Sequence, residues 1–359
     1  MTDPLAERLA ARTLELVDIP SESRDEATLA AHALEVLERG GVPVRDAGDT
    51  CVLAGVLERG ERPLVLLAGH LDTVPAQGNR PGSLAGGVVK GLGASDMKGS
   101  LAVMLELALA RARGLTAEDG IDLGYVLFGR EELPQHESAL APLLAREPGL
   151  RSADLAIVME PTAGALQAGC LGNVNAAWEF RGRSGHAARP WLADNAVHRA
   201  GRGIAALADV EPIEHVFDGL RYSEVVSVTM VEGGLAQNVI PDRASAHVNY
   251  RYPPGMARAA AEERLHGLCD PFGELRILSN ASSGRVPHGN PLVEQLRAAG
   301  DLRTEPKQAW TPVAELAEAG VDAVNFGPGD PARAHTRDEQ VDAEALLHAY
   351  RVLDAFARS

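Results

Sequence analysis

A histidine and an aspartate, separated by one residue, follow an apolar run that is typical of a buried strand. The run PLVLLAG (63–69) leads directly into His70 and Asp72. Alternate residues of an extended segment point to the same side, so both side chains would lie on one face at the edge of a sheet. A carboxylate in that position can orient an imidazole that ligates a metal. A buried, hydrogen-bonded histidine beside a capping aspartate is the alternative interpretation.

A third candidate, Asp96, stands in the glycine-rich string GLGASDMKGS, which leads into a helix predicted after Gly99. Gly91 and Gly93 begin a G-x-G-x-x-G dinucleotide pattern, but Asp96 occupies the place of the third glycine. A carboxylate at that helix N-terminus would repel a pyrophosphate. The Gly-Lys-Ser/Thr of a P-loop is also missing at the required spacing. Asp96 therefore fits an anionic metal ligand, with helix capping as its alternative.

Two further predicted strands are also followed by carboxylates. Glu131 and Glu132 come after a strand predicted at 121–128, and Glu160 comes after one predicted at 154–159. Adjacent side chains point in different directions, so one glutamate can bind a metal while its neighbour reaches a water as general base. Solvated loop charges are the alternative for such a pair.

A second histidine completes a set of residues of metal-ligating type, each following a strand of one predicted sheet. The set is His70, Asp96, Glu132, Glu160 and His335, the last in the loop after a strand predicted at 322–326. Sites of open α/β sheets gather at the carboxyl ends of the strands. Two imidazoles and three carboxylates suit two divalent ions, with one carboxylate bridging and positions left open for water. The shared placement therefore predicts a dinuclear metal site.

The order of apolar segments predicts an α/β domain that an α+β domain interrupts. At first, helical patterns alternate with short apolar strands, which favours a mostly parallel sheet. Residues 173–284 instead follow a β-α-β-β-α-β order, typical of a ferredoxin-like antiparallel sheet with helices on one face. The chain then returns to helix, strand and helix. We therefore expect a catalytic domain of residues 1–172 and 285–359 and an inserted domain of residues 173–284.

The composition is that of an acidic globular protein. The 359 residues carry 34 Lys and Arg against 50 Asp and Glu, which gives a formal charge of −16 and argues against nucleic-acid and anionic-membrane partners. Cys51, Cys170 and Cys269 are too scattered for a disulfide framework or a CxxC zinc site. No signal-peptide pattern and no membrane-spanning apolar stretch is visible, so we expect a cytoplasmic protein.

Longer strings, spread in order over nearly the whole chain, resemble the M20 family of metallohydrolases. They include LLAGHLDTVPAQG, GLGASDMKGSLAVML, MEPTAGALQAGCLGN, SGHAARPWLADNAVH, GGLAQNVIP, VNYRYPP and VNFGPGDPARAHTRDEQ. Within the family, AGCLGN, HAARPW, NYRYPP and GPGDP-x-x-AH resemble the succinyl-diaminopimelate desuccinylases of actinobacterial type. The resemblance implies a zinc-exopeptidase-like catalytic domain with a mostly parallel sheet and a ferredoxin-like inserted domain.

The resemblance also assigns roles to the candidate ligands. Asp96 would bridge two zinc ions, with cobalt as an alternative metal in one or both sites. His70 and Glu160 would complete one site, whereas Glu132 and His335 would complete the other. Asp72 would orient His70, and Glu131 would act as general acid and base.

In the inserted domain, the resemblance implies a lid through which the chain forms a homodimer. His186 would reach the active site of the partner subunit and stabilise the oxyanion. Asn238 and Arg251 match positions that bind substrate carboxylates, and Thr311 matches a substrate contact in the returning segment. A turn residue and a strand-face charge are the alternatives for Asn238 and Arg251.

The implied reaction is hydrolysis of N-succinyl-LL-2,6-diaminopimelate to succinate and LL-2,6-diaminopimelate, a step of lysine biosynthesis. Acetylornithine deacetylation, or another amidase or peptidase activity of the M20 family, is the alternative. A non-catalytic metal-binding homologue is disfavoured because all five ligand positions and the base are present. Two departures bear on specificity: Leu133-Pro134 follows the glutamate pair, and Cys170 stands where a more distant branch carries arginine.

Overall fold

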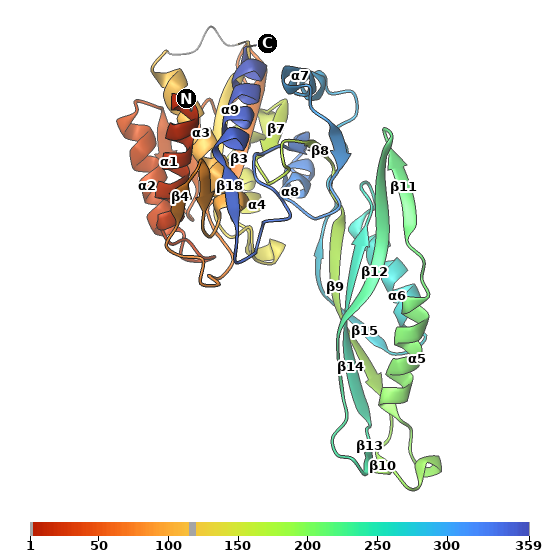
Figure 1. The fold of residues 1–359 in the computed structure, drawn as a ribbon. Coiled ribbons are helices and arrows are strands. Elements are labelled where there is room, and N and C mark those ends of the chain that lie inside the picture. Colours follow the sequence, from red (N-terminus) through yellow and green to blue (C-terminus); the bar gives the residue numbers. More distant parts are fainter. Residues whose placement is uncertain (1–2, 115–119, 359) are drawn as a thin grey trace. The chain divides into compact units, whose positions relative to one another are not determined.

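The chain forms two compact units in the computed structural model, which describes residues 3–114 and 120–358 (Figure 1). Unit 1 comprises Met1–Gly169, Arg285–Pro306 and Thr311–Ser359, and unit 2 comprises Cys170–Gly284 and Lys307–Trp310. The sequence-based boundaries differ slightly, since they assign residues 170–172 and 307–310 to the catalytic domain. The division into a catalytic domain and a lid stays a prediction.

Four parallel strands form the centre of the unit 1 sheet. Their order across the sheet is β6 (Asp122–Phe128), β3 (Leu64–His70), β7 (Leu155–Val158) and β17 (Ala323–Asn325). All residues of β3, β7 and β17 are buried, which explains why their sequences are continuous apolar runs rather than alternating ones. The sequence-based expectation of an α/β unit with parallel strands is confirmed.

Antiparallel strands at both margins make the complete sheet a mixed one. On one side, β2 (Val52–Gly55) runs antiparallel to β6 and is followed by β1 (Val44–Asp46). On the other side, β8 (Leu166–Ala168) is antiparallel to β17, and β16 (Thr304–Pro306) is parallel to β8. A separate small sheet has the order β18 (Gln340–Asp342), β5 (Val88–Lys90) and β4 (Ser83–Ala85).

Helices of unit 1 pack against one another around this sheet. One contacting group consists of α1 (Pro4–Asp18), α3 (Gly99–Ala112) and α9 (Ala343–Ala357), and a second consists of α4 (Leu140–Arg146) and α8 (Val313–Glu318). Helix α3 is buried on every side from Gly99 to Ala110, so its sequence there is apolar all round except for Ser100 and Glu106. The remaining helices are α2 (Ala27–Arg39) and α7 (Pro291–Gly300).

Unit 2 is built on a five-stranded antiparallel sheet with the order β11, β12, β14, β9, β15. These strands are β9 (Gly172–Arg181), β11 (Ile213–Phe217), β12 (Leu220–Gly233), β14 (Arg243–Tyr252) and β15 (Glu274–Ala281). Helices α5 (Ala196–Ala208) and α6 (Arg258–Cys269) complete the β-α-β-β-α-β order that the sequence predicts.

Alternate residues of β9 and β14 are buried and form the core of unit 2 under α5 and α6. Trp178 lies at its centre and donates its indole N–H to the carbonyl oxygen of Cys269 over 3.1 Å. This alternation of buried and partly exposed positions is the signal that distinguishes the sheet of unit 2 from that of unit 1. Strand β11 is an addition to the ferredoxin-like pattern, and the sequence analysis does not anticipate it.

No helix among residues 3–114 and 120–358 combines the length and the apolar character that a membrane span requires.

Candidate metal centre

The carboxyl ends of the four parallel strands meet at one edge of the unit 1 sheet. His70 is the last residue of β3, Glu131 and Glu132 follow β6, and Glu160 follows β7. The loop that carries His335 follows β17. Side chains that are far apart in the sequence are therefore brought to one place, as is general for open α/β sheets.

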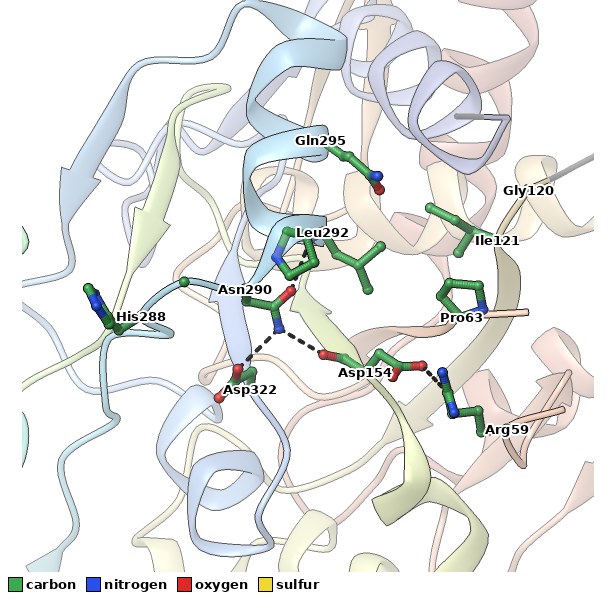
Figure 2. A pocket seen from close by; sticks show the side chains of 12 residues that line it. Arg59, Pro63, Gly120, Ile121, Asp154, His288, Asn290, Leu292, Gln295 and Asp322 are labelled. Atoms are coloured by element: carbon green, nitrogen blue, oxygen red, sulfur yellow. Dashed lines mark hydrogen bonds and ion pairs between the residues drawn. The ribbon is translucent and has the colours of Figure 1, made fainter. Parts of the chain in front are cut away.

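A surface hollow lies at the opposite edge of the same strands (Figure 2). Pro63, Ile121, Asp154 and Asp322 line it, and each directly precedes one of the four parallel strands. Asp154 accepts a hydrogen bond from Nε of Arg59 over 2.7 Å. The hollow is thus at the amino ends of the strands and is separate from the candidate metal centre.

The first group of candidate ligands consists of His70, Asp96 and Glu160, all of them buried. Nε2 of His70 lies 3.0 Å from Oδ1 of Asp96 and 3.9 Å from Oε1 of Glu160. One ligand atom from each residue lies within 4.8 Å of the others. The imidazole and the two carboxylates therefore surround a space of the size that one metal ion needs.

The second group consists of Asp96, Glu132 and His335. Nε2 of His335 lies 2.9 Å from Oε1 of Glu132 and 3.5 Å from Oδ2 of Asp96. Asp96 belongs to both groups, and each of its two oxygens faces a different histidine. His335 has a φ of 60°, in the left-handed region that residues with a side chain seldom adopt.

Asp72 makes contacts that differ in detail from the expected ones. Nδ1 of His70 lies 3.0 Å from the backbone oxygen of Asp72, whereas the carboxylate is 3.6 Å away, beyond hydrogen-bond distance. The carboxylate instead accepts the backbone N–H groups of Glu131 (2.9 Å) and Glu132 (3.0 Å) and the hydroxyl of Ser23 (2.8 Å). Asp72 therefore holds the imidazole by its main chain and the glutamate turn by its side chain.

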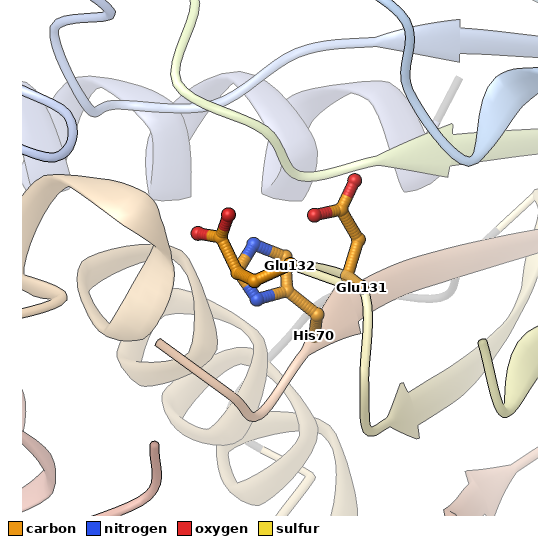
Figure 3. A group of neighbouring side chains, drawn as sticks. All are labelled: His70, Glu131 and Glu132. Carbon is orange, nitrogen blue, oxygen red and sulfur yellow. The ribbon is translucent and has the colours of Figure 1, made fainter. Parts of the chain in front are cut away.

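Glu131 and Glu132 carry their carboxylates to separate points around the imidazole of His70 (Figure 3). Burial raises the pKa of Glu131 well above its ordinary value, and the nearby charge of Glu160 adds to the rise. A carboxylate with a raised pKa beside a metal-binding cluster has the properties of a general base.

The carboxylates create a negative potential that acts on both histidines. Burial lowers the pKa of His70, but the hydrogen bond with Asp96 and the surrounding carboxylate charges raise it well above the ordinary value. The hydrogen bond with Glu132 raises the pKa of His335 to about 9, against a smaller opposing effect of burial. A potential that holds protons on two imidazoles also favours divalent cations at the same place.

The residues present therefore fit two divalent cations. Carboxylate oxygens and imidazole nitrogens are ligands that zinc accepts, and an aspartate whose oxygens face two different histidines is arranged to bridge two ions. The sequence-based ligands His70, Asp96, Glu132, Glu160 and His335 are all brought together, with Glu131 beside them. Their individual roles stay predictions.

The sequence analysis misses Glu339, a buried glutamate directly before β18. Its carboxylate accepts backbone N–H groups from the segment that carries Asp96. Burial raises the pKa of Glu339 to about 7, although these backbone hydrogen bonds lower it. Gly93 in this segment has a φ of +79°, and a Cβ there would lie 2.8 Å from Cγ2 of Thr73, so a glycine is required.

In unit 2, His186 and Asn238 lie close together on an exposed two-stranded element. Strand β10 (Gly185–His186) pairs with β13 (Val239–Ile240), and the N–H of Ala187 donates to the backbone oxygen of Asn238 over 3.0 Å. Nδ1 of His186 accepts the N–H of Ala188 over 3.1 Å. In the neutral imidazole the proton is then on Nε2, which is free to donate to an anion.

Arg251 lies near the other end of unit 2, close to where the chain enters and leaves it. It follows Arg243, the first residue of β14, by eight positions, roughly 27 Å at about 3.4 Å per residue. Its Nε donates to Oδ1 of Asn249 over 2.9 Å, and burial lowers its pKa. The structure thus places Arg251 apart from His186 and Asn238. Thr311 belongs to unit 1, where it is buried just before α8.

The chain is similar over nearly its whole length to proteins with an assigned activity. It is 39% identical over 344 residues, 95% of both chains, to a Mycobacterium tuberculosis protein with the name "Putative succinyl-diaminopimelate desuccinylase DapE". It is 35% identical to the succinyl-diaminopimelate desuccinylase of Corynebacterium glutamicum, covering 96% of this chain and 94% of that protein. A LysW-lysine hydrolase of Deinococcus radiodurans is 29% identical, with 98% and 97% covered.

Solved structures share the fold at lower sequence identity. The aminopeptidase PepT of Bacillus cereus has a TM-score of 0.79 at 19% identity, with 98% of each chain covered. The YXEP protein of Bacillus subtilis, described as a dinuclear metal-binding peptidase of the M20 family, has a TM-score of 0.72 at 17% identity, with 98% and 97% covered. The model of peptidase family M20/M25/M40 matches residues 66–359. The chain belongs to this family and is a metal-dependent hydrolase that acts on an amide bond.

Proposed function

We propose that the protein is a dinuclear zinc amidohydrolase that hydrolyses N-succinyl-LL-2,6-diaminopimelate to succinate and LL-2,6-diaminopimelate in lysine biosynthesis. The observation that supports a dinuclear centre most directly is Asp96, whose two oxygens face His70 and His335. The similarity to desuccinylases over more than nine-tenths of the chain supports the substrate. Cobalt in one or both sites is compatible with the same ligands.

In this proposal Asp96 would hold both ions, His70 and Glu160 would complete one site, and Glu132 and His335 would complete the other. Bound divalent ions supply Lewis-acid polarisation of the amide carbonyl and lower the pKa of a water molecule. Glu131 takes the proton of the attacking water and returns it to the departing amine. Its carboxylate lies within 4.8 Å of ligand atoms of His70 and Glu132, which places a proton acceptor beside the candidate ligands.

His186 stabilises the negative charge that develops on the carbonyl oxygen. Its Nδ1 is occupied by the N–H of Ala188, so its Nε2 carries the hydrogen that an oxyanion needs. Asn238, beside it, and Arg251 bind carboxylates of the substrate, and Thr311 contacts the substrate from unit 1. Arg251 is partly buried, so its interaction with a carboxylate is only weakly screened by solvent.

We further propose that the protein is a homodimer formed through unit 2 and that His186 acts in the active site of the partner. Arg251 lies roughly 27 Å along β14 from Arg243, and His186 and Asn238 lie on the β10–β13 element, which precedes Arg243 in the chain. We therefore infer that one copy of unit 2 does not present all three side chains to one small substrate. Strand β12 pairs with β11 only from Leu220 to Glu224. From Val225 to Gly233, β12 pairs with β14 on one side and with no other strand of the described chain on the other side. Met230 and Val231 of this edge are exposed. A long apolar edge is suited to pairing with another chain.

A panel of substrates tests the proposed reaction. The metal content of each sample is measured while the purified protein is assayed with N-succinyl-LL-diaminopimelate, N-acetylornithine and a short peptide. We expect rapid turnover only of the succinyl substrate, by protein that holds two metal ions. Turnover of acetylornithine without turnover of the succinyl substrate would instead assign the protein to the deacetylases. The LysW-lysine hydrolase of D. radiodurans makes LysW-lysine a further candidate substrate for the panel.

A further inference from the structure

We propose that Glu339 is a positioning residue that fixes the segment carrying Asp96 and thereby sets the affinity of the protein for both metal ions. This inference rests on the proposed function only in taking Asp96 as the bridging ligand. Glu339 itself belongs to none of the groups of potential metal ligands among the described residues, and its two carboxylate oxygens accept three backbone N–H groups.

Three hydrogen bonds carry the argument. Oε1 of Glu339 accepts the N–H groups of Ser95 (3.0 Å) and Asp96 (2.9 Å), and Oε2 accepts the N–H of Gly93 (3.0 Å). Glu339 is 2% exposed, so these bonds form away from water. Hydrogen bonds to an ionised acceptor are stronger than neutral ones, and burial strengthens them further.

Residues 335–340 carry a candidate ligand and also contact the segment that carries Asp96. His335, a candidate ligand, lies four residues before Glu339, and Gln340 after it pairs with Lys90 in the small sheet. The backbone oxygen of Glu339 also accepts the N–H of Gly91 over 3.0 Å. The main chain of Glu339 and Gln340 is thus fastened to Lys90 and Gly91, and the side chain of Glu339 is fastened to the segment from Gly93 to Asp96.

Removal of this carboxylate would leave buried N–H groups without an acceptor. Such groups cost free energy until they find water or another partner, so the segment from Gly93 to Asp96 would rearrange. Asp96 would then lose the position in which its oxygens face His70 and His335. Loss of a residue that orients a metal ligand typically weakens metal affinity about 10- to 100-fold.

Glu339→Gln and Glu339→Asp test the role, and Glu106→Gln is the matched control. Glu106 is also a buried glutamate of unit 1, but it accepts hydrogen bonds from Arg8 and Arg12 and contacts no candidate ligand in the described structure. Affinities for Zn²⁺ and Co²⁺ are measured by competition with a chromophoric chelator. Amide hydrogen exchange of residues 91–97 is measured in the metal-free proteins.

We expect Glu339→Gln to bind both ions about 10- to 100-fold more weakly and to exchange the amides of Gly93, Ser95 and Asp96 faster. Glu339→Asp keeps the charge on a shorter side chain, so its metal affinity and its amide exchange rates should lie between those of Glu339→Gln and the wild type. Glu106→Gln should keep wild-type metal affinity even where it lowers the melting temperature.

Metal affinity within twofold of wild type in both Glu339 variants would overturn the proposal. An equal loss of affinity in Glu106→Gln would overturn it as well, because the effect would then be one of general stability. These measurements use no substrate, so they remain decisive even if the protein hydrolyses a different amide.

Discussion

Oδ1 of Asp72 accepts the backbone N–H of Glu131 over a distance of 2.9 Å. The residue whose main chain holds His70 therefore also fixes the start of the turn that carries the proposed base. A shift of Asp72 would move the proposed ligand His70 and the proposed base Glu131 together, so one aspartate would couple metal binding to proton transfer.

Asp72→Asn should lower kcat about 10- to 100-fold and weaken metal binding. An amide has one carbonyl oxygen, so it can accept only one of the two N–H groups of Glu131 and Glu132 well, and its NH₂ group would face the other donor. Steady-state kinetics and metal titration of the same preparation provide the test.

Asp154→Asn is the matched control for this substitution. Asp154 also accepts a backbone N–H, that of Leu64 over 2.9 Å, but it lies at the amino ends of the parallel strands. We expect it to lower stability while metal affinity and kcat stay within twofold of wild type. Equal effects of the two variants on metal affinity would show that Asp72 has no special role at the centre.

Glu131→Gln should keep two metal ions while kcat falls about 10²- to 10⁴-fold, the usual contribution of a general acid–base residue. The neighbouring Glu132→Gln should instead lose one ion, because Glu132 rather than Glu131 contacts His335 in the second group. Metal analysis by mass spectrometry alongside kinetics separates the two roles. A loss of metal from the Glu131 variant, with full occupancy of the Glu132 variant, would mean that the two glutamates have exchanged roles.

His186→Ala should reduce kcat about 10²- to 10³-fold, the effect of losing one oxyanion donor, without a change in metal content. His198→Ala is the control, since His198 is an exposed histidine of unit 2 on α5. Kinetics of the two variants at saturating metal provide the measurement, and His198→Ala should match the wild type.

Mixed dimers decide which subunit His186 serves. Subunits with His186→Ala are mixed with subunits with Glu131→Gln, each inactive alone. If His186 acts across the dimer, each heterodimer has one complete site, and random mixing restores about a quarter of wild-type activity. If the mixture stays as inactive as its components, His186 does not act across the interface.

Glu224→Gln should lower the stability of unit 2 in a pH-dependent manner. Burial raises the pKa of Glu224, but hydrogen bonds from His215, Tyr250 and Arg264 outweigh burial and lower the pKa below its ordinary value. A carboxyl group with a lowered folded-state pKa stabilises the protein above its unfolded-state pKa, and this stability is lost as pH falls through the folded-state value.

Urea unfolding of wild type and variant from pH 7 to pH 4 therefore has a predicted sign. The free energy of unfolding of Glu224→Gln should be about 1–3 kcal/mol lower than that of the wild type near pH 7. This difference should shrink once the pH falls below about 4.5. Glu214→Gln is the control. Glu214 lies on the neighbouring β11 and forms an exposed ion pair with Arg221, so its loss should change the free energy of unfolding by less than about 1 kcal/mol. A Glu224 difference that grows toward low pH would contradict this assignment.

The strand ends of unit 1 could be read from the sequence because buried parallel strands are continuous apolar runs. Polar residues directly after such a run are expected at the edge of the sheet. The sequence therefore predicted that His70, Glu132 and Glu160 lie close together. Glu339 escaped notice because it stands in the polar string ARAHTRDEQV, where its burial depends on contacts with a distant loop. The contact of His70 with the backbone oxygen of Asp72 could not be predicted either. Every residue has a backbone oxygen, so residue types do not show which one a side chain will contact.

In unit 2, strand-like runs predicted the four ferredoxin-like strands but not β11. Its sequence, IEHVF, is short, and all five of its residues are exposed or half-buried, so it carries little periodic signal. The paired positions of His186 and Asn238 likewise depend on β10 and β13, two-residue strands that no hydrophobic pattern reveals.

The pairing of β17 with β7 joins residues 323–325 to residues 156–158, on either side of the whole of unit 2. As the chain is synthesised, His70, Asp96, Glu132 and Glu160 emerge before unit 2, whereas His335 and Glu339 emerge after it. A nascent chain that ends before residue 335 lacks one imidazole of the centre and the carboxylate that fastens the Asp96 segment. With the ligands proposed above, full metal loading would therefore wait for the end of synthesis, when β17 can enter the sheet beside β7 and unit 2 has already been made.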